Sequence, residues 1–261
     1  MAWGRKVRSC GVLLNSETGQ RRLVGAMKVM AFASQKGGSG KTTLAGHMAV
    51  EAQRSGAGPV AMLDLDPQGS LTLWWEARES EAPSLLRTAE ARLAEDLARL
   101  DKEGTQIVVV DTPPAITATI CRVVSAADLV VIPTRPSPHD LRAAGATVQL
   151  CDRLQKPIIF AINGATPRAR ITTEAVIALS HHGAVAPTVV HQRVDFASSM
   201  IDGRTVMEIA SQTRSAEEIA ALWAFLRDCL EGRVRLRVGA PGGVYSQPSV
   251  FSGEVVVQGA A

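Results

Sequence analysis

The sequence predicts an α/β fold in which a doubly wound, mostly parallel sheet carries helices on both faces. Two observations predict it. Short, nearly unbroken apolar runs recur through the middle of the 261-residue chain, as expected for strands that are covered on both faces. Stretches with helical periodicity separate these runs, and an alternation of strands and helices indicates parallel pairing. Ligands of such sheets bind at the carboxyl ends of the strands.

The apolar runs are the predicted strands, and most of them end in a polar or glycine-rich turn. Their residues are mainly valine, isoleucine, leucine and alanine, and few polar residues interrupt them. This is typical of buried parallel strands. In chain order the predicted strands are Lys28–Ala33, Val60–Asp64, Ile107–Asp111, Leu129–Pro133, Pro157–Asn163 and Val185–Val190.

Helical periodicity marks the segments between and after these strands. Leucines recur at helical spacing from Leu86 to Leu100, and apolar residues from Ile219 to Leu226 share one face. Asp140 is the predicted N-cap of the helix that it opens. The predicted helices are Thr42–Ser55, Ser84–Leu100, Asp140–Leu154 and Ala216–Leu230.

Composition excludes several classes of protein. Apolar residues make up 46% of the chain and charged residues 20%, which rules out a disordered chain. The length suits one large α/β domain or two small ones. No apolar run approaches the ~18 residues that a membrane span needs. The four cysteines, Cys10, Cys121, Cys151 and Cys229, are scattered, so we expect a reduced cytoplasmic protein without a metal or iron–sulfur site in one chain.

The formal net charge of +3 comes from the two ends of the chain. Residues 1–26 hold five basic residues and one acidic residue, and residues 232–261 hold three and one. The segment 27–231 is therefore mildly acidic, and the net charge of the chain does not by itself indicate nucleic-acid binding. We predict a basic N-terminal extension (1–26), an α/β domain (27–231) and a flexible Gly/Pro/Ser-rich tail (232–261). For the extension, a transit peptide and a start of translation at Met27 both stay open.

The strongest motif is SQKGGSGKTT, residues Ser34–Thr43, between the first predicted strand and the first predicted helix. Glycines let several backbone N–H groups point at one anion, and the helix N-terminus adds partial positive charge. Lys41 supplies a full charge to outer phosphates, and the Thr42 hydroxyl suits Mg²⁺. The loop therefore predicts a nucleotide-phosphate site. Gln35 stands where the general P-loop pattern has glycine, and Lys36 is an additional lysine.

This loop resembles the deviant Walker A motif of the ParA/MinD family of ATPases. The resemblance continues through DLDPQGS from Asp64, DTPP from Asp111, the segment 127–134 and GRTV from Gly203, and it covers about residues 27–231. It implies a P-loop NTPase-like fold. The DPQG and DTPP forms resemble the ParA branch more than the MinD branch. Residues 1–26 are too short for the operator-reading domain of the larger ParA type, so the resemblance is closest to small ParA-type partition ATPases.

The resemblance implies residue roles and the cofactors ATP and Mg²⁺. Two monomers would hold two ATP molecules between them as a homodimer. Lys36 resembles the signature lysine that reaches the partner's nucleotide, and Asp66 resembles the aspartate that orients the attacking water, so the implied catalytic residues are Lys36, Lys41 and Asp66. The implied Mg²⁺ residues are Thr42, Asp64 and Asp111. The implied nucleotide contacts are Gly37, Gly38, Ser39, Gly40, Lys41, Thr42 and Thr43.

Asn163, which ends a predicted strand, resembles the family residue that hydrogen-bonds adenine. As a lone asparagine it is equally well interpreted as a turn former. The resemblance therefore implies an adenine contact here, whereas the residue itself leaves both interpretations open.

Members of this family bind DNA without sequence specificity when they dimerise with ATP. The candidates here are Arg168, Arg170, Arg193, Arg204 and Arg214, and Arg214 matches a family position that contacts DNA. Acidic residues offset most of this charge between residues 163 and 214, so binding requires that the arginines gather on one face. For each single arginine, a surface ion pair is the other interpretation.

The sequence thus predicts an ATPase that partitions or positions a plasmid, a chromosome region or a large protein cargo. We expect it in the cytoplasm, associated with the nucleoid, and stimulated by a ParB-like or cargo-adaptor protein. A MinD-like, membrane-cycling regulator of division-site placement is the alternative. It needs an amphipathic C-terminal helix, whereas residues after Glu231 are rich in glycine and proline, so we expect no stable membrane association. A relative of the nitrogenase iron protein would need a second cluster cysteine beside Cys121, and a dethiobiotin-synthetase-like ligase is a further metabolic alternative.

Overall fold

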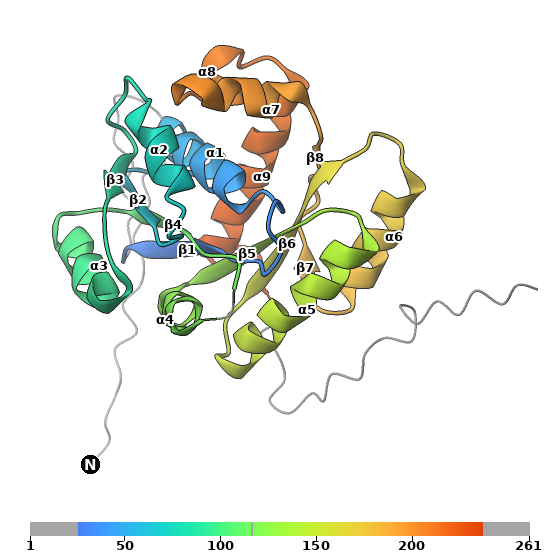
Figure 1. Ribbon diagram of the computed structural model, residues 1–261, viewed down its shortest axis with the longest axis horizontal. Coiled ribbons are helices and arrows are strands. Elements are labelled where there is room, and N and C mark those ends of the chain that lie inside the picture. Colours follow the sequence, from blue (N-terminus) through green and yellow to red (C-terminus); the bar gives the residue numbers. More distant parts are fainter. Residues whose placement is uncertain (1–25, 116, 237–261) are drawn as a thin grey trace, which may run out of the picture.

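A parallel sheet forms the centre of the molecule in the computed structural model, which describes residues 26–115 and 117–236 (Figure 1). The strands lie in the order β3-β2-β4-β1-β5-β6-β7, and β8 pairs with β6. Every pairing among them is parallel, which confirms the predicted doubly wound sheet. The strands are β1 (Lys28–Phe32), β2 (Val60–Asp64), β3 (Ser84–Leu86), β4 (Ile107–Asp111), β5 (Leu129–Thr134), β6 (Ile158–Ala165), β7 (Ala184–Val185) and β8 (Val190–His191).

Helices cover both faces of this sheet, and successive residues of each buried strand face opposite cores. Met30 and Phe32 of β1 pack in one cluster and Val29 and Ala31 in the other. Helices α1, α2, α8 and α9 pack on the first face, and α3, α4, α5 and α6 pack on the second (Figure 1). The helices are α1 (Lys41–Arg54), α2 (Ser70–Glu76), α3 (Leu93–Lys102), α4 (Ala118–Ala126), α5 (Pro138–Arg153), α6 (Arg170–Ser180), α7 (Val194–Ser199), α8 (Val206–Ile209) and α9 (Arg214–Leu230), with short 3₁₀ turns η1 (Glu90–Arg92) and η2 (Met200–Asp202).

The predicted helix Ser84–Leu100 is wrong in its first half. Residues Ser84–Leu86 form β3, an edge strand whose Leu86 lies opposite Leu63 of β2, and the helix begins only at Leu93. The strand alternation of period two places Leu85 against one core cluster and Leu86 against the other. The helical spacing of Leu86 from the later leucines is therefore coincidental, because backbone pairing with β2 decides the local structure.

The predicted strand Val185–Val190 is also interrupted. It divides into the two-residue strands β7 and β8, which pair with β6, and the Ala186 N–H adds one hydrogen bond to Phe160 of β6. Pro187 lies between them and has no backbone N–H to donate to a neighbouring strand. β8 consequently pairs with β6 at Asn163, close to the carboxyl end of the sheet.

The N-cap of α5 is Ser137, and the predicted cap, Asp140, lies in the first turn instead. The backbone N–H of Asp140 donates to the Ser137 hydroxyl at 3.2 Å, and that hydroxyl donates to the Asp140 carboxylate at 2.5 Å. Pro138 occupies the first helical turn, where its missing N–H costs nothing. The helix therefore starts two residues earlier than the sequence suggested.

Both chain ends fall largely outside the described residues, so the predicted boundaries at 26 and 232 stay predictions. The described start of the tail contacts the core, because Val234 and Leu236 pack against the cluster under α9. Within residues 26–115 and 117–236, none of the helices combines the length and apolarity of a bilayer span.

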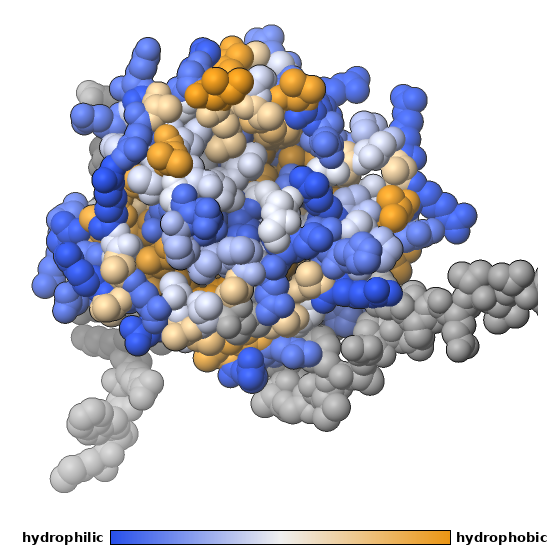
Figure 2. Space-filling model, viewed as in Figure 1, coloured by the Kyte–Doolittle hydropathy of each residue, from blue (hydrophilic) through white to orange (hydrophobic). Residues whose placement is uncertain are grey.

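Exposed apolar side chains gather on one part of the surface. They lie over α7 and α8, at the top of the view in Figure 2. Val194, Ile201 and Ile209, which belong to α7, η2 and α8, are exposed there. Most of the remaining visible surface is polar, so this apolar patch, residues Val194, Ile201 and Ile209, is a distinct feature.

Candidate functional site

The loop between β1 and α1 is shaped to receive an anion. Gly38 and Gly40 have φ values of 74° and 94°, which glycine adopts without strain. A side chain at Gly37 or Gly38 would meet open space, so the loop surface is free for a ligand. No side chain caps the N-terminus of α1, and its first turn has no acidic residue. The first N–H groups of α1 are therefore available to a phosphate.

Asn163 of β6 supports this loop from behind. Its Nδ2 donates to the Ser39 carbonyl at 2.8 Å, and a side chain at Gly40 would collide with the same amide. The strand continues to Ala165, so Asn163 does not end it as the sequence suggested. The structure thus gives Asn163 a loop-bracing contact, and its implied contact with adenine stays a prediction.

The two lysines of the loop differ in their surroundings. Lys41 is buried, and burial lowers the pKa of its ammonium, although Asp111 and Asp66 oppose this shift. No carboxylate among the described residues lies within ion-pairing distance of it. Lys36 is half-buried at the start of the loop, and its backbone N–H donates to the Ser34 hydroxyl at 3.3 Å. A buried ammonium without a bonded carboxylate fits a site that receives phosphate charge.

Two aspartates stand side by side at the carboxyl ends of β2 and β4. Asp64 lies opposite Asp111 in the parallel register. The Thr42 hydroxyl donates to Asp111 at 2.5 Å, and Asp111 is fully buried, which raises the pKa of its carboxyl group to about 7. Asp64 instead accepts hydrogen bonds from the Thr72 backbone N–H and hydroxyl, at 2.8 and 2.9 Å. The two carboxylates therefore face different helices, α1 and α2.

The oxygen ligands around Thr42 fit Mg²⁺. In phosphate sites this ion binds one or two carboxylates, waters and substrate oxygens, and it needs no cage of protein ligands. The Thr42 hydroxyl and the Asp111 carboxylate touch beneath the loop, where such an ion would sit. Among the described residues, no group of three or more His, Cys, Asp or Glu side chains has the arrangement of a metal cage. Bound there, Mg²⁺ would neutralise phosphate charge.

Asp66 follows in the loop that joins β2 to α2. Its backbone N–H donates to Asp64 at 3.1 Å, and its carboxylate accepts from the Gln68 N–H at 3.0 Å. It is half-buried, and its charge acts on Lys41. The structure thus brings Lys41, Asp66, Asp64 and Asp111 to one edge of the sheet, as the sequence predicted for the phosphate loop and the aspartates.

A family comparison agrees with this arrangement. The sequence model of the CobQ/CobB/MinD/ParA nucleotide binding domain matches residues 30–206, which is more than half of the chain. The chain belongs to this family. The matched region of this CobQ/CobB/MinD/ParA domain starts in β1, includes the phosphate loop and both strand-end aspartates, and ends at the start of α8.

Individual relatives cover different shares of the domain. The maintenance of carboxysome distribution protein A of Halothiobacillus neapolitanus is 28% identical over 198 residues, which are 72% of this chain and 91% of that protein. Protein ParA of Rhizobium radiobacter is 36% identical over 126 residues, 48% of this chain and 56% of that protein. A crystal structure of a ParA family ATPase from Chlorobium tepidum TLS superposes with a TM-score of 0.63 at 21% identity, over 76% of this chain and 99% of that one, which shows the same fold.

Sequence reasoning missed two polar residues that hold this site. Thr72 binds Asp64 from the first turn of α2, and no motif marks it. His47 lies one turn after the phosphate loop in α1, where its Nδ1 is 2.8 Å from the Thr43 carbonyl and its Nε2 accepts from the Val206 N–H at 3.3 Å. A histidine within the apolar stretch 44–50 of this helix was the available signal. His47 therefore joins the phosphate loop to α8.

The burial of His47 predicts a pH-dependent stability. Burial lowers the pKa of this imidazole from 6.5 to about 4, with Glu208 raising it and Arg78 lowering it by smaller amounts. Between these two pKa values the unfolded chain binds a proton at His47 and the native state does not, so the free energy of unfolding falls as the pH falls through this window. The loss reaches about 3 kcal/mol at the lower end.

Denaturant unfolding of the wild type and the His47→Gln variant at pH 7.5, 6, 5 and 4.5 measures this effect. As the pH falls, the free energy of unfolding of the wild type should decrease more than that of the variant. The other titrating groups are common to both proteins, so the difference reports on His47. An equal pH dependence in both proteins would contradict the buried, neutral state of His47.

The candidate DNA-binding arginines divide into paired and unpaired residues. Arg193 binds Glu218 of α9 through two hydrogen bonds, Arg204 binds Asp202 at 2.6 Å, and Arg170 binds Glu174 at 2.9 Å. Arg214 is exposed, and none of the described residues forms an ion pair with it. Arg168 is exposed as well, on the loop after β6.

Arg193 and Arg214 lie at one junction, between α7 and α9. Glu218, which holds Arg193, is one turn after Arg214 on α9, and Ser215 donates to Asp195 of α7 at 2.8 Å. Arg214 occupies the first position of α9, where a cation opposes the helix dipole. The Gln192 N–H donates to the Ala165 carbonyl at 2.9 Å, which brings the loop of Arg168 beside this junction. The structure thus brings Arg168, Arg193 and Arg214 of the predicted set to this junction. Of all five, only Arg168 and Arg214 form no ion pair among the described residues, because carboxylates hold Arg193, Arg170 and Arg204.

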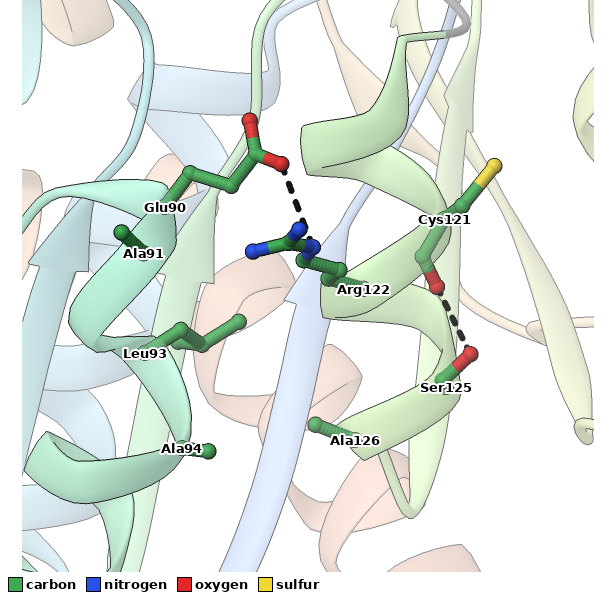
Figure 3. A pocket seen from close by; sticks show the side chains of 8 residues that line it. All are labelled: Glu90, Ala91, Leu93, Ala94, Cys121, Arg122, Ser125 and Ala126. Carbon is green, nitrogen blue, oxygen red and sulfur yellow. Dashed lines mark hydrogen bonds and ion pairs between the residues drawn. The ribbon is translucent and has the colours of Figure 1, made fainter.

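A separate hollow of about 460 Å³ lies between α3 and α4. Leu93 and Ala94 of α3 face Arg122 and Ala126 of α4 across it, and Arg122 forms an ion pair with Glu90 (Figure 3). None of the phosphate-loop residues lines it. It is thus distinct from the nucleotide site.

Proposed function

We propose that this protein is an ATPase that dimerises with ATP, binds DNA without sequence specificity and partitions or positions a plasmid, a chromosome region or a large protein cargo. The observation that carries the proposal is the two-lysine phosphate loop, in which Lys41 is buried and Lys36 stands at the open side. Gly37 and Gly38 are exposed beside Lys36, so a second molecule can approach the loop face.

This open loop face supports a nucleotide-dependent dimer. Lys36 has no ion pair among the described residues, and its ammonium is available to phosphate charge on a second copy of the chain. A second cation at a developing phosphoryl charge stabilises the transition state, as an arginine finger does. In this proposal Asp66 would orient the attacking water, and Thr42 and Asp111 would hold Mg²⁺, which would neutralise phosphate charge. The names of two relatives, a carboxysome-distribution protein and a chromosome-partitioning ATPase, support a positioning role.

DNA binding in this proposal uses the α7–α9 junction, with Arg214 and the neighbouring Arg168, while Arg193 is held by Glu218 of α9. The salt dependence of binding scales with the number of phosphates neutralised, at about −0.9 in log–log slope for each contact. Two or three contacts for each monomer bind weakly, and dimerisation doubles their number without a new kind of contact. Affinity for DNA is thereby switched by ATP and lost after hydrolysis.

The partner that stimulates hydrolysis is a ParB-like or cargo-adaptor protein. Exposed apolar groups on neighbouring elements are typical of protein-contact surfaces. The apolar patch of Val194, Ile201 and Ile209 is such a surface. It supports a protein partner beside the DNA-binding junction.

The Arg214→Glu variant tests the DNA-binding surface. We expect the dimer to lose its two Arg214 contacts, so that the slope of log K against log salt shrinks by about 2 in magnitude. ATP-driven dimerisation should persist, because Arg214 contacts none of the phosphate-loop residues. DNA retention in a salt series and light scattering with ATP measure the two properties.

Arg153→Glu is the matched control, since Arg153 is exposed at the last residue of α5, away from the carboxyl ends of the strands. It should change neither property. If Arg214→Glu retained DNA as the control does, the α7–α9 junction would not be the DNA surface. If it lost dimerisation as well, Arg214 would have a structural role.

A further inference from the structure

Helix α2 is bound at both ends to segments that lie far apart in the sequence. In its first turn, Thr72 donates two hydrogen bonds to Asp64, at the end of β2. Near its other end, the Trp74 Nε1 donates to the Arg204 carbonyl at 3.2 Å. The Trp74 ring also packs against Gly46 of α1. This one helix therefore connects the Asp64–Asp66 strand end with the residues that precede α8.

Arg78 reinforces this connection two residues after the end of α2. Its side chain is 2% exposed. It donates to the Gly203 carbonyl at 2.5 Å and to the Glu208 carboxylate at 2.7 and 3.1 Å, and it lies 5.0 Å from the centre of the Trp74 ring. A buried guanidinium is held in place by its acceptors. If one of these acceptors moves, Arg78 must move with it or lose a hydrogen bond inside the protein.

The segment Gly203–Glu208, which accepts the hydrogen bonds of Arg78, has little room to move independently of α2. A side chain at Gly203 would collide with the backbone of Ala77 and Arg78. Glu208 also accepts from the Thr205 N–H and hydroxyl, both at 2.9 Å, which closes the capping box of α8. From the nucleotide side, His47 accepts from Val206 and contacts the Thr43 carbonyl. Two routes thus run from the phosphate site to this segment, one along α1 and one along α2.

We propose that Arg78 is a positioning residue that couples the nucleotide site to DNA binding. The inference rests on the proposed function. A shift of the Asp64–Gly69 loop on nucleotide binding carries α2 with it through Thr72. Arg78 and Trp74 pass this shift to Gly203–Glu208, and the short helix α8 passes it to the start of α9, where Arg214 lies. The buried ion pair of Arg78 with Glu208 is the link between the two surfaces.

The test compares Glu208→Gln and Trp74→Phe with the wild type. Glu208→Gln removes the charge that holds Arg78. Trp74→Phe removes the hydrogen bond to Arg204 and makes the ring beside Gly46 smaller, while an aromatic ring remains. The matched control is Glu76→Gln, at the end of the same helix, where Glu76 pairs with the exposed Arg87 instead of the buried Arg78. The readouts are the affinity for a fluorescent ATP analogue, the melting temperature, and the affinity for a random 60-base-pair duplex with ATP and with ADP.

We expect both test variants to bind the ATP analogue within about twofold of the wild type and to lose most of the ATP dependence of DNA binding. The ratio of DNA affinities with ATP and ADP should fall about tenfold in Glu208→Gln and several-fold in Trp74→Phe, within the usual range of coupling between sites. Because coupling is reciprocal, the effect of DNA on ATP affinity should fall by the same factor. The control should keep the wild-type ratio.

Unchanged ratios in Trp74→Phe and in folded Glu208→Gln would overturn the inference, as would equal losses of DNA affinity with ATP and with ADP. Trp74→Phe decides the question if Glu208→Gln does not fold. A wild type whose DNA binding ignores ATP would overturn the proposed function itself. A wild type with ATP-dependent binding and insensitive variants would overturn only the coupling.

Discussion

Replacing Lys41 with alanine is expected to lower ATP hydrolysis by about 10²- to 10³-fold, the usual effect of removing one donor that stabilises developing charge. The Lys41 ammonium is buried beside the phosphate loop, and no described carboxylate pairs with it. Its charge is therefore available to the phosphates. ATP affinity should fall together with the rate, because the same ammonium binds the ground state. Steady-state hydrolysis and titration with a fluorescent ATP analogue measure both.

Lys28→Ala is the control for this substitution. Lys28 starts β1 at the opposite end of the strand from the phosphate loop, and its ammonium lies 3.7 Å from Asp128 at the surface. Its loss should leave hydrolysis and nucleotide affinity unchanged. Wild-type hydrolysis in Lys41→Ala would exclude this loop as the site of phosphate chemistry, and an unfolded variant would be recognised from its circular dichroism.

Replacing Asp66 with alanine should separate ATP binding from hydrolysis. We expect hydrolysis to fall by about 10²- to 10⁴-fold, the range for loss of a group that takes up a proton or orients water. ATP binding and dimerisation should persist, since the only hydrogen bond of the Asp66 side chain among the described residues is to the Gln68 N–H in its own loop, and its backbone bonds to Asp64 and Gly69 remain in the variant. DNA retention with ATP should become long-lived. Phosphate release and DNA dissociation after removal of free ATP measure the two effects.

Asp66→Asn distinguishes charge from loop geometry, because the amide oxygen can still accept from the Gln68 N–H. It should hydrolyse ATP as slowly as Asp66→Ala. Recovery of the wild-type rate in Asp66→Asn would assign Asp66 to the structure of the loop. Loss of ATP binding in both variants would do the same.

The sequence predicted those parts of the fold whose signals are local. Strands β2 and β4 begin and end where the apolar runs do, and α1 begins one residue before its predicted start. The phosphate loop was predictable because its glycines and lysines determine its chemistry directly. Asp64 and Asp111 were predictable as neighbours, since the carboxyl ends of parallel strands meet at one edge.

Features that depend on distant partners could not be read from the sequence. Leu86 belongs to a strand because β2 has an open edge beside it. Asn163 turns toward the phosphate loop because Gly40 leaves room for its amide. Arg78 carries no motif, and its role emerges only when Gly203 and Glu208 fold against it. The ion pair of Arg193 with Glu218 could not be predicted either, because the two residues are 25 positions apart and meet only when α9 packs beside α7.

DNA affinity of the Asp66→Ala variant with ATP and with ADP, measured across a salt series, tests the central claim that nucleotide switches DNA binding. We expect strong binding with ATP, with a log–log salt slope about twice that with ADP, since dimerisation doubles the phosphate contacts. Equal affinity and equal slope with the two nucleotides would contradict it.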